Sequence, residues 1–156
     1  KLQRAFAKRT IKKSYLTMVK GRWEEQERWV RSPLKKYRLV SGERIVRVHE
    51  EGKPAETLFK LRENFKDMSL LEALPRTGRT HQIRVHAQSI RYPIACDDKY
   101  GDERFNVCCQ KQGLRRMFLH AQSLHLPADI LGEEMVFEAP LSDDLLNFLA
   151  MQQSNT

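Results

Sequence analysis

The sequence predicts an α+β fold in which helices flank a mixed, mainly antiparallel sheet. Short segments that alternate apolar and polar residues recur along the chain, most cleanly over residues 44–49, and a period of two is typical of half-buried strands. Turn-forming residues such as Gly52-Lys53-Pro54 separate these segments closely enough for hairpins. Fewer segments show helical spacing, and a chain of 156 residues with 40% hydrophobic content is sufficient for one domain with a modest core.

The first half of the chain is expected to consist mostly of strands. A short basic helix over residues 2–10 has an apolar stripe on one side, and residues 14–21 then alternate as a strand, with Tyr15 on one face and Leu16 on the other. Residues 22–40 mix aromatic and charged side chains irregularly and are expected to form a connecting loop with a short edge strand. Further strands are predicted at residues 44–49, 57–62 and 68–74.

Residues 74–86, LPRTGRTHQIRVH, are the segment richest in chemically active side chains. Gly78 gives the backbone freedom to turn, and either Thr77 or Thr80 can cap a helix that follows. Basic side chains would then leave this turn in a fixed fan, which suits a polyanion or a buried carboxylate. They are Arg76, Arg79, His81, Arg84 and His86.

The same segment has both strand-like and helix-like spacing. Ile83 and Val85 alternate as in a strand, whereas Ile83, Ala87 and Ile90 recur as on one face of a helix. We favour a helix that begins near residue 80 and ends before Tyr92-Pro93, because the residue before a proline is pushed out of the helical region. An arginine beside Ile and Val in such a helix tends to be buried with a partner, although a solvated surface remains the alternative.

The last third of the chain alternates short helices and strands. The adjacent residues Asp97 and Asp98 are expected to cap a turn, since neighbouring carboxylates point in different directions on most backbones. A short helix is predicted within residues 102–113, ended by Gly113, and strands at 116–126 and 135–139 enclose a loop at 127–132. Ser142 is a suitable N-cap for a final helix with acidic residues in its first turn.

Charge favours a polyanionic partner. The chain has 28 basic and 20 acidic residues, a formal charge of +8 and a pI near 9.6, which indicates RNA, DNA or an acidic surface without distinguishing them. Lys12 and Lys13 are candidates for phosphate contacts, or alternatively the solvated end of a helix. The mixed aromatic and basic residues at positions 29–38 are either a stacking surface for RNA or hydrophobic anchors beneath a loop.

Metal binding is not indicated by the histidine spacing. His81 and His86 are five residues apart, as are His120 and His125, whereas a helical ligand pair is spaced by four and a strand pair by an even number. The three cysteines form no CxxC pair, which is typical of a reducing compartment. No apolar run approaches the length of a membrane span.

Several segments in order resemble the motifs of RluA-type RNA pseudouridine synthases, which isomerise selected uridines in structured RNA. Besides residues 74–86, the matching segments are KKSYLTMVKG (12–21), EGKPAET (51–57), YPIACDDKYG (92–101), RMFLHA (116–121) and FEAPL (137–141). The segment SGERIVRV (41–48) resembles more specifically the RluC branch, which modifies large-subunit (23S) ribosomal RNA. The resemblance implies a pseudouridine-synthase-like sheet and no cofactor or metal.

One family motif has no counterpart in the sequence. The family's catalytic aspartate lies in an HRLD-type motif upstream of the KKSYLTMVKG equivalent, and HRLD does not occur in these 156 residues. Residues 1–156 are therefore interpreted as the C-terminal portion of a catalytic domain, without the HRLD half and any N-terminal RNA-binding domain. On this interpretation we expect the isolated chain to be incomplete and inactive.

The resemblance also assigns roles to individual residues. It implies that Arg84 pairs with the catalytic aspartate, that Tyr15 stacks on the target base and that Ile83 lines the base pocket. Arg79, His81 and Lys13 are candidates for RNA contacts. We expect a bacterial, cytoplasmic and monomeric protein whose partner is large-subunit ribosomal RNA. Two alternatives remain: an RNA-binding module without catalysis, and a metal-dependent nuclease, against which the histidine spacing speaks.

Overall fold

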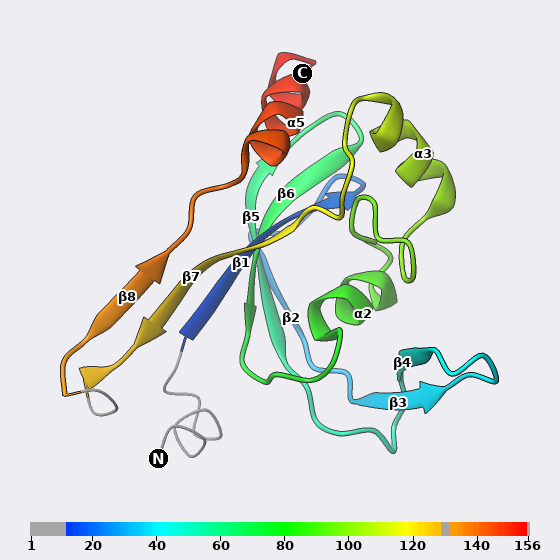
Figure 1. Cartoon of the computed structure of the whole chain (residues 1–156), viewed down its shortest axis with the longest axis vertical. Helices are drawn as coiled ribbons and strands as arrows, with labels where there is room; N and C mark the ends of the chain where they lie inside the picture. Colours follow the sequence, from blue (N-terminus) through cyan, green and yellow to red (C-terminus); the bar gives the residue numbers. More distant parts are fainter. Residues whose placement is uncertain (1–11, 129–131, 156) are drawn as a thin grey trace.

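The computed structural model describes residues 12–128 and 132–155, and it has the α+β fold that the sequence predicts. Six strands form one antiparallel sheet in the order β2-β5-β6-β1-β7-β8, and β3 and β4 form a separate two-stranded sheet (Figure 1). The strands of the larger sheet are β1 Lys12–Lys20, β2 Glu27–Val30, β5 Thr57–Asn64, β6 Met68–Pro75, β7 Leu119–Leu126 and β8 Met135–Glu138. The helix expected over residues 2–10 lies outside the described residues, as does part of the loop expected at 127–132.

β1 lies inside the sheet and confirms the strand predicted at residues 14–21. It pairs antiparallel with β6 on one side and β7 on the other. Successive side chains of β1 point to opposite faces of the sheet. Val19 belongs to the core beneath α2 (Gln82–Ser89), and Met18 belongs to the core on the opposite face. Tyr15 therefore emerges on the α2 face, opposite the small residues Ala73 and Ala121.

The segment 22–40 differs from its prediction. β2 is the expected edge strand, but β3 (Leu34–Arg38) is a second strand that pairs with β4 (Arg44–Val48) in the smaller sheet. Two adjacent lysines and the preceding Pro33 obscure the alternation of β3 in the sequence. Its strand conformation is stabilised by partners outside the segment, since Leu34 and Val46 are both buried in a small core against α2.

Two larger cores hold the helices on the sheet. The core under α2 unites the sheet residues Phe59 and Leu71 with Ile83 and Ala87 of the helix. The core on the other face includes residues of α3 (Glu103–Lys111) and α5 (Asp143–Ser154). α2 thus lies between the large sheet and the β3–β4 sheet (Figure 1). This position brings residues 74–86 next to Tyr15.

The helix predicted in the central segment is present, but neither threonine caps it. His81 occupies the N-cap position in the left-handed region (φ 54°) without a side-chain cap, and the helix ends at Ser89, before Tyr92-Pro93 as expected. Thr77 instead donates to Gln82 Oε1 (2.6 Å) and accepts the backbone N–H of Glu56 (3.0 Å). Its hydroxyl is therefore committed to holding the loop before the helix.

The later helices follow their predictions with one correction. Asp102 caps α3 by accepting the backbone N–H of Phe105 (2.8 Å), and Gly113 follows the helix with φ 97°. Ser142 is at the N-cap position of α5, but its hydroxyl makes no capping hydrogen bond to the backbone. It donates to the Asp144 carboxylate and accepts from Arg116 instead. The hydroxyl is therefore bound to neighbouring side chains and not to the backbone N–H groups at the start of the helix.

Candidate active site

One cavity brings together all six residues that the sequence analysis selected. It has a volume of about 310 Å³ and lies between β1, the loop that follows β6, and the start of α2. Gly78 turns the backbone there, and its surroundings are open, because an added Cβ would meet only Lys13 Nζ at 4.0 Å. The lining includes Lys13, Tyr15, Arg79, His81, Ile83 and Arg84, together with Pro75, Thr77, Gly78, Gln82 and Leu119.

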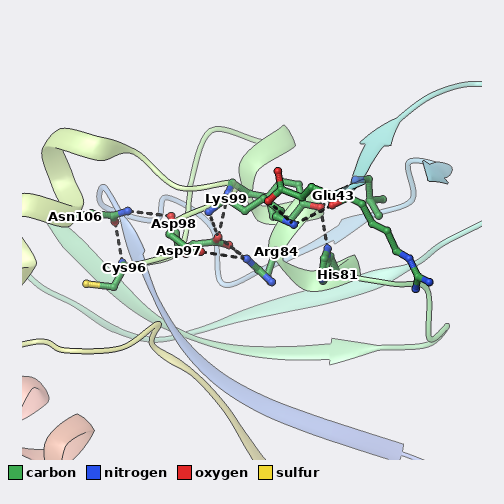
Figure 2. Close-up of polar contacts among 11 residues, drawn as sticks. Glu43, His81, Arg84, Cys96, Asp97, Asp98, Lys99 and Asn106 are labelled. Carbon is green, nitrogen blue, oxygen red and sulfur yellow. Dashed lines mark hydrogen bonds and ion pairs between the residues drawn. The ribbon is translucent and has the colours of Figure 1, made fainter. Parts of the chain in front are cut away.

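Arg84, which lines this cavity, forms a two-pronged ion pair with Asp97 (Figure 2). Its Nε and Nη2 donate to the two carboxylate oxygens at 2.9 and 2.8 Å, and the Asp97 side chain is fully buried while that of Arg84 is 16% exposed. Burial acts to raise the pKa of Asp97, but the hydrogen bond from Arg84 and those from backbone N–H groups outweigh it, so the pKa is lowered. The pair is therefore fully ionised at neutral pH.

The turn prediction for Asp97 and Asp98 is confirmed, but sequence reasoning missed the partner of Arg84. Asp97 Oδ1 accepts the backbone N–H groups of Lys99 and Tyr100, each at 3.0 Å, and the Asp98 side chain is fully exposed. The pattern of an arginine among apolar residues indicated that a buried acceptor exists. Only the fold shows that it is Asp97.

Among the described residues, Nη1 of Arg84 has no hydrogen-bond acceptor, since both bonds to Asp97 come from Nε and Nη2. The guanidinium also lies 5.0 Å from the ring centre of Tyr100, a position that favours a cation over the aromatic face. Asp97 and Tyr100 thus fix the orientation of a cation that borders the cavity. Nη1 is left for a further anionic group, while the exposed carboxylate of Asp98 lies 3.9 Å from Nη2.

His81 is held in a defined state by Tyr100. Tyr100 Oη accepts the backbone N–H of Val46 (3.0 Å) and lies 2.9 Å from His81 Nδ1. The hydroxyl of Tyr100 already accepts the N–H of Val46, so its own proton can be donated to Nδ1 of His81. Nδ1 is then the acceptor, and the imidazole carries its proton on Nε2. Burial, followed by the charges of Arg84 and Lys99, lowers the pKa of His81. The site therefore contains a neutral histidine.

A second polar network fixes the loop between β6 and α2. Gln82 is buried, and its Oε1 accepts from the Thr77 hydroxyl (2.6 Å) and the Arg79 backbone (3.1 Å), while its Nε2 donates to Thr57 Oγ1 (2.9 Å). Thr57 also lies 2.8 Å from Nδ1 of His86, whose Nε2 donates to a backbone carbonyl. This network holds the backbone of Arg79, which lines the cavity, and does not involve the charge of its side chain.

Tyr15 and Ile83 supply the apolar part of the cavity. Ile83 is 7% exposed and packs in the core beneath α2, while the half-buried ring of Tyr15 packs against the same core. The two small residues opposite Tyr15 leave room beside its ring, because cross-strand neighbours lie only about 5 Å away. One face of the cavity is therefore aromatic and aliphatic, and the other is cationic.

The part of the chain that the structure describes contains no gathering of three or more His, Cys, Asp or Glu side chains that could hold a metal ion. Within residues 12–128 and 132–155, no helix is both long and apolar enough to cross a membrane.

The sheet carries an arginine–carboxylate pair and an aromatic ring around one cavity, and comparison with known proteins specifies the family. Residues 1–89 match the family model described as RNA pseudouridylate synthase. The chain belongs to this family.

Within the family, the chain is similar to bacterial ribosomal large subunit pseudouridine synthase C. It is 44% identical over 149 residues to that protein of Haemophilus ducreyi, covering 96% of this chain and 47% of the relative. It is 45% identical over 148 residues to the Pasteurella multocida protein, covering 95% and 45%. The chain thus spans about half the length of the curated relatives it matches.

Solved structures agree on the fold. Human RNA Pseudouridylate Synthase Domain Containing 4 matches with a TM-score of 0.75 and 25% identity, over 97% of this chain and 66% of that one. Human RNA Pseudouridylate Synthase Domain Containing 1 matches with a TM-score of 0.74 and 26% identity, over 89% and 58%. The resemblance inferred from the sequence motifs is therefore confirmed.

Proposed function

We propose that this chain forms one wall of the active site of an enzyme that isomerises specific uridines of large-subunit ribosomal RNA to pseudouridine in the cytoplasm. The observation that carries the proposal is the single cavity that joins Arg84, fixed by Asp97, to Tyr15 and Ile83. The similarity to ribosomal large subunit pseudouridine synthase C supports the choice of RNA. The reaction is an isomerisation, so it consumes no second substrate.

Arg84 is proposed to pair with the catalytic aspartate of an upstream HRLD segment. Asp97 already occupies Nε and Nη2, so the aspartate would accept from Nη1, on the edge without an acceptor in the described part of the chain. A carboxylate beside a guanidinium stays ionised and oriented. That aspartate would attack the uridine, after which the base detaches from its sugar, turns and rejoins it through carbon.

The remaining cavity residues would hold the target base and its strand. Moving a base out of its stack costs a few kcal/mol, and stacking on an aromatic ring recovers about 1–3 kcal/mol per base. Tyr15 is positioned to supply the ring and Ile83 the apolar contact. Lys13, Arg79 and His81 would contact the RNA, with His81 acting as a neutral hydrogen-bond donor through Nε2.

Residues 1–156 are proposed to work together with the HRLD segment as one catalytic domain, and the isolated chain is proposed to be inactive. The test compares pseudouridine formation on protein-free large-subunit ribosomal RNA by this chain and by a form extended upstream through the HRLD motif. Product from the extended form alone is the expected result. Product from the short chain would place the nucleophile within these residues and contradict the assigned role of the aspartate. RNA binding without product from either form would favour a binding module.

Arg84→Lys and Tyr15→Ala in the extended form test the two central roles. Lysine cannot present the same planar fork to two carboxylates, so Arg84→Lys is expected to abolish turnover, and near-normal turnover would remove Arg84 from the assignment. Tyr15→Ala is expected to lower the rate, whereas Tyr15→Phe retains the stacking ring. If Tyr15→Ala left the rate unchanged, the stacking role would be wrong.

A further inference from the structure

A second cavity, of about 410 Å³, lies directly beside the first. It is enclosed by the β3–β4 sheet, the turn at residues 51–53 and the loop at residues 78–80. Gly78 and Arg79 line both cavities, so only this short loop separates them. The other lining residues are Leu34, Lys35, Lys36, Val46, Glu51, Gly52, Lys53 and Thr80.

The second cavity has an apolar floor and a cationic rim. Leu34 and Val46 are 4% and 1% exposed and form the floor. Lys36, Lys53 and Arg79 bring three positive charges to the lining, whereas the ammonium of Lys35 lies 5.6 Å from the ring centre of Tyr37, and Glu51 contributes the single carboxylate. That carboxylate lies 3.9 Å from Lys35 with both side chains well exposed, and such pairs interact weakly in water. The rim is therefore positively charged overall.

The walls of this cavity are fixed by backbone contacts. Lys53 and Leu34 exchange two backbone hydrogen bonds of 2.8 and 2.9 Å, which tie the turn to the start of β3. Gly52 fits closely against the same strand, since an added Cβ would lie 2.5 Å from the carbonyl carbon of Leu34. Arg79 Nε donates to the Pro54 carbonyl (2.8 Å), which anchors its guanidinium between the two cavities. The site is thus formed before any ligand binds.

We propose that the second cavity binds a nucleotide that neighbours the target uridine in the same RNA strand. The apolar floor suits a base or ribose, and the lysine rim and Arg79 suit its phosphate, because backbone phosphates supply most of the affinity of single-stranded RNA. Arg79 can then hold the phosphate that links the two nucleotides, since it lines both cavities. The identity of the strand rests on the proposed function, whereas the affinity for a nucleotide does not.

An acidic peptide is the other ligand that a cationic rim could attract. The observations favour RNA, because the cavity opens beside the one that contains Tyr15, and a strand leaving the first cavity has only the loop at residues 78–80 to cross. An apolar floor under a cationic rim also matches the two chemically distinct halves of a nucleotide. Competition by polyglutamate distinguishes the two ligands.

The test measures the affinity of this chain for a uridine-containing single-stranded RNA of about ten nucleotides, a length within the range of single-strand binding sites. The double variant Lys36→Gln/Lys53→Gln removes two charges of the rim. The logarithm of the RNA affinity falls linearly with the logarithm of the salt concentration, and each lost phosphate contact makes this slope shallower by about 0.7. At about 0.1 M salt this corresponds to a loss of roughly fivefold in affinity. We therefore expect a loss of about five- to 25-fold and a slope reduced by about 0.7 to 1.4.

The matched control is Lys66→Gln/Lys111→Gln, which removes the same charge from exposed residues of the β5–β6 turn and α3. Its affinity for the RNA is expected to stay within about twofold of the unmodified chain, because long-range interactions between exposed charges are screened by salt. Glu51→Gln should act in the opposite direction and strengthen RNA binding. An equal loss in the control and the cavity variant, or unchanged affinity in the cavity variant, would overturn the proposal, as would competition by polyglutamate as strong as by RNA.

The outcomes also separate this proposal from the proposed function. If the extended enzyme makes pseudouridine and Lys36→Gln/Lys53→Gln leaves both its KM and the RNA affinity unchanged, the nucleotide site is wrong and the enzymatic function is retained. If no form makes pseudouridine but the cavity variant alone weakens RNA binding, the nucleotide site is supported and the enzymatic function is wrong.

Discussion

The loop at residues 96–101 and the β3–β4 sheet both carry charged side chains beside α2, but they use them in opposite ways. In the loop, the fully buried side chain of Asp97 accepts four hydrogen bonds, two from Arg84 and two from backbone N–H groups. In the β3–β4 sheet, Lys36, Arg38, Arg44 and Arg47 are exposed. Buried charge must be paired, whereas exposed charge is stabilised by water.

The buried charges of the loop therefore position side chains, whereas the exposed charges of the sheet can attract an anionic ligand. Removing a partner within the loop leaves an uncompensated buried group, so its charges define the geometry of Arg84 and His81. Removing an exposed charge from the sheet leaves no buried charge without a partner, so its cations remain available to an anion and act through their sum. Stability measurements can test this contrast, because the loop should be sensitive to single changes and the surface should not.

The largest effect is expected for Asp97→Asn. The substitution removes the negative charge opposite Arg84, and breaking a buried ion pair from one side costs about 3–5 kcal/mol. Asp98→Asn is the matched control, because the carboxylate of Asp98 lies 3.9 Å from the same Arg84 but is fully exposed. An exposed pair contributes little, so the effect should stay within about 0.5 kcal/mol. Urea denaturation of the two variants measures both values. Similar stability of the two variants would show that the Asp97 pair does not hold the loop.

Gly101→Ala should be nearly as harmful. An added Cβ would lie 2.2 Å from the carbonyl oxygen of Asp97 and 3.0 Å from Asn106 Nδ2, and that carbonyl already accepts from Gly101 N and from Asn106. Overpacking of this kind costs about 1–3 kcal/mol, and contact with backbone places the expected cost near 3 kcal/mol. Gly78→Ala is the control, with open space around its Cβ. An unfolding midpoint for Gly101→Ala equal to that of Gly78→Ala would refute the packing argument.

Thr57→Val should cost about 2 kcal/mol, within the usual range for an unsatisfied buried polar group. The hydroxyl lies between Gln82 Nε2 and His86 Nδ1, and both Thr57 and His86 are fully buried. Valine keeps the shape and removes both hydrogen bonds. Thr57→Ser restores the hydroxyl and should recover most of the loss in urea denaturation. If serine were no better than valine, the hydroxyl would not be the stabilising group.

Mild acid should also weaken the fold. Burial lowers the pKa of His86, opposed by the hydrogen bond to Ser32, and burial likewise lowers the pKa of His81. Both imidazoles bind protons more readily in the unfolded chain, so their contribution is complete above the unfolded value of about 6.5 and is lost as the pH falls through their lower folded values. Unfolding free energies measured at about pH 7 and about pH 5.5 should therefore decrease toward acid. A flat or rising profile over this interval would contradict a neutral His86.

The fold was predictable where periodicity is local. β1 and α2 are visible in the sequence because their apolar spacing and their ends lie within the segment itself. β3 was missed because its partner β4 and the helix beneath Leu34 supply its stabilisation from outside. The capping role of Thr77 was wrong for a related reason, since its hydroxyl is used by Gln82 and Glu56, which no local rule connects to it.

In the site, too, local features were predictable from the sequence and contacts between distant segments were not. The sequence located the residues around the first cavity, because residues 79–84 are contiguous and Tyr15 belongs to a recognisable motif. It indicated that Arg84 needs a buried acceptor, but not that Asp97, thirteen positions away, accepts from it. The second cavity could not be foreseen at all, because three separate segments meet there only after the β3–β4 sheet has formed.

The smallest effect is expected where the two regions touch. Lys99 Nζ of the loop lies 3.1 Å from Glu43 beside β4 and donates to the Arg44 carbonyl at 2.9 Å (Figure 2). The Glu43 side chain is 53% exposed, and such ion pairs contribute about 0–1 kcal/mol. Glu43→Gln should therefore change the urea midpoint slightly, and high salt should remove the difference, because the carbonyl still fixes Lys99. A loss as large as that of Asp97→Asn would show that the surface pair is part of the buried network, and the contrast between the two regions would then fail.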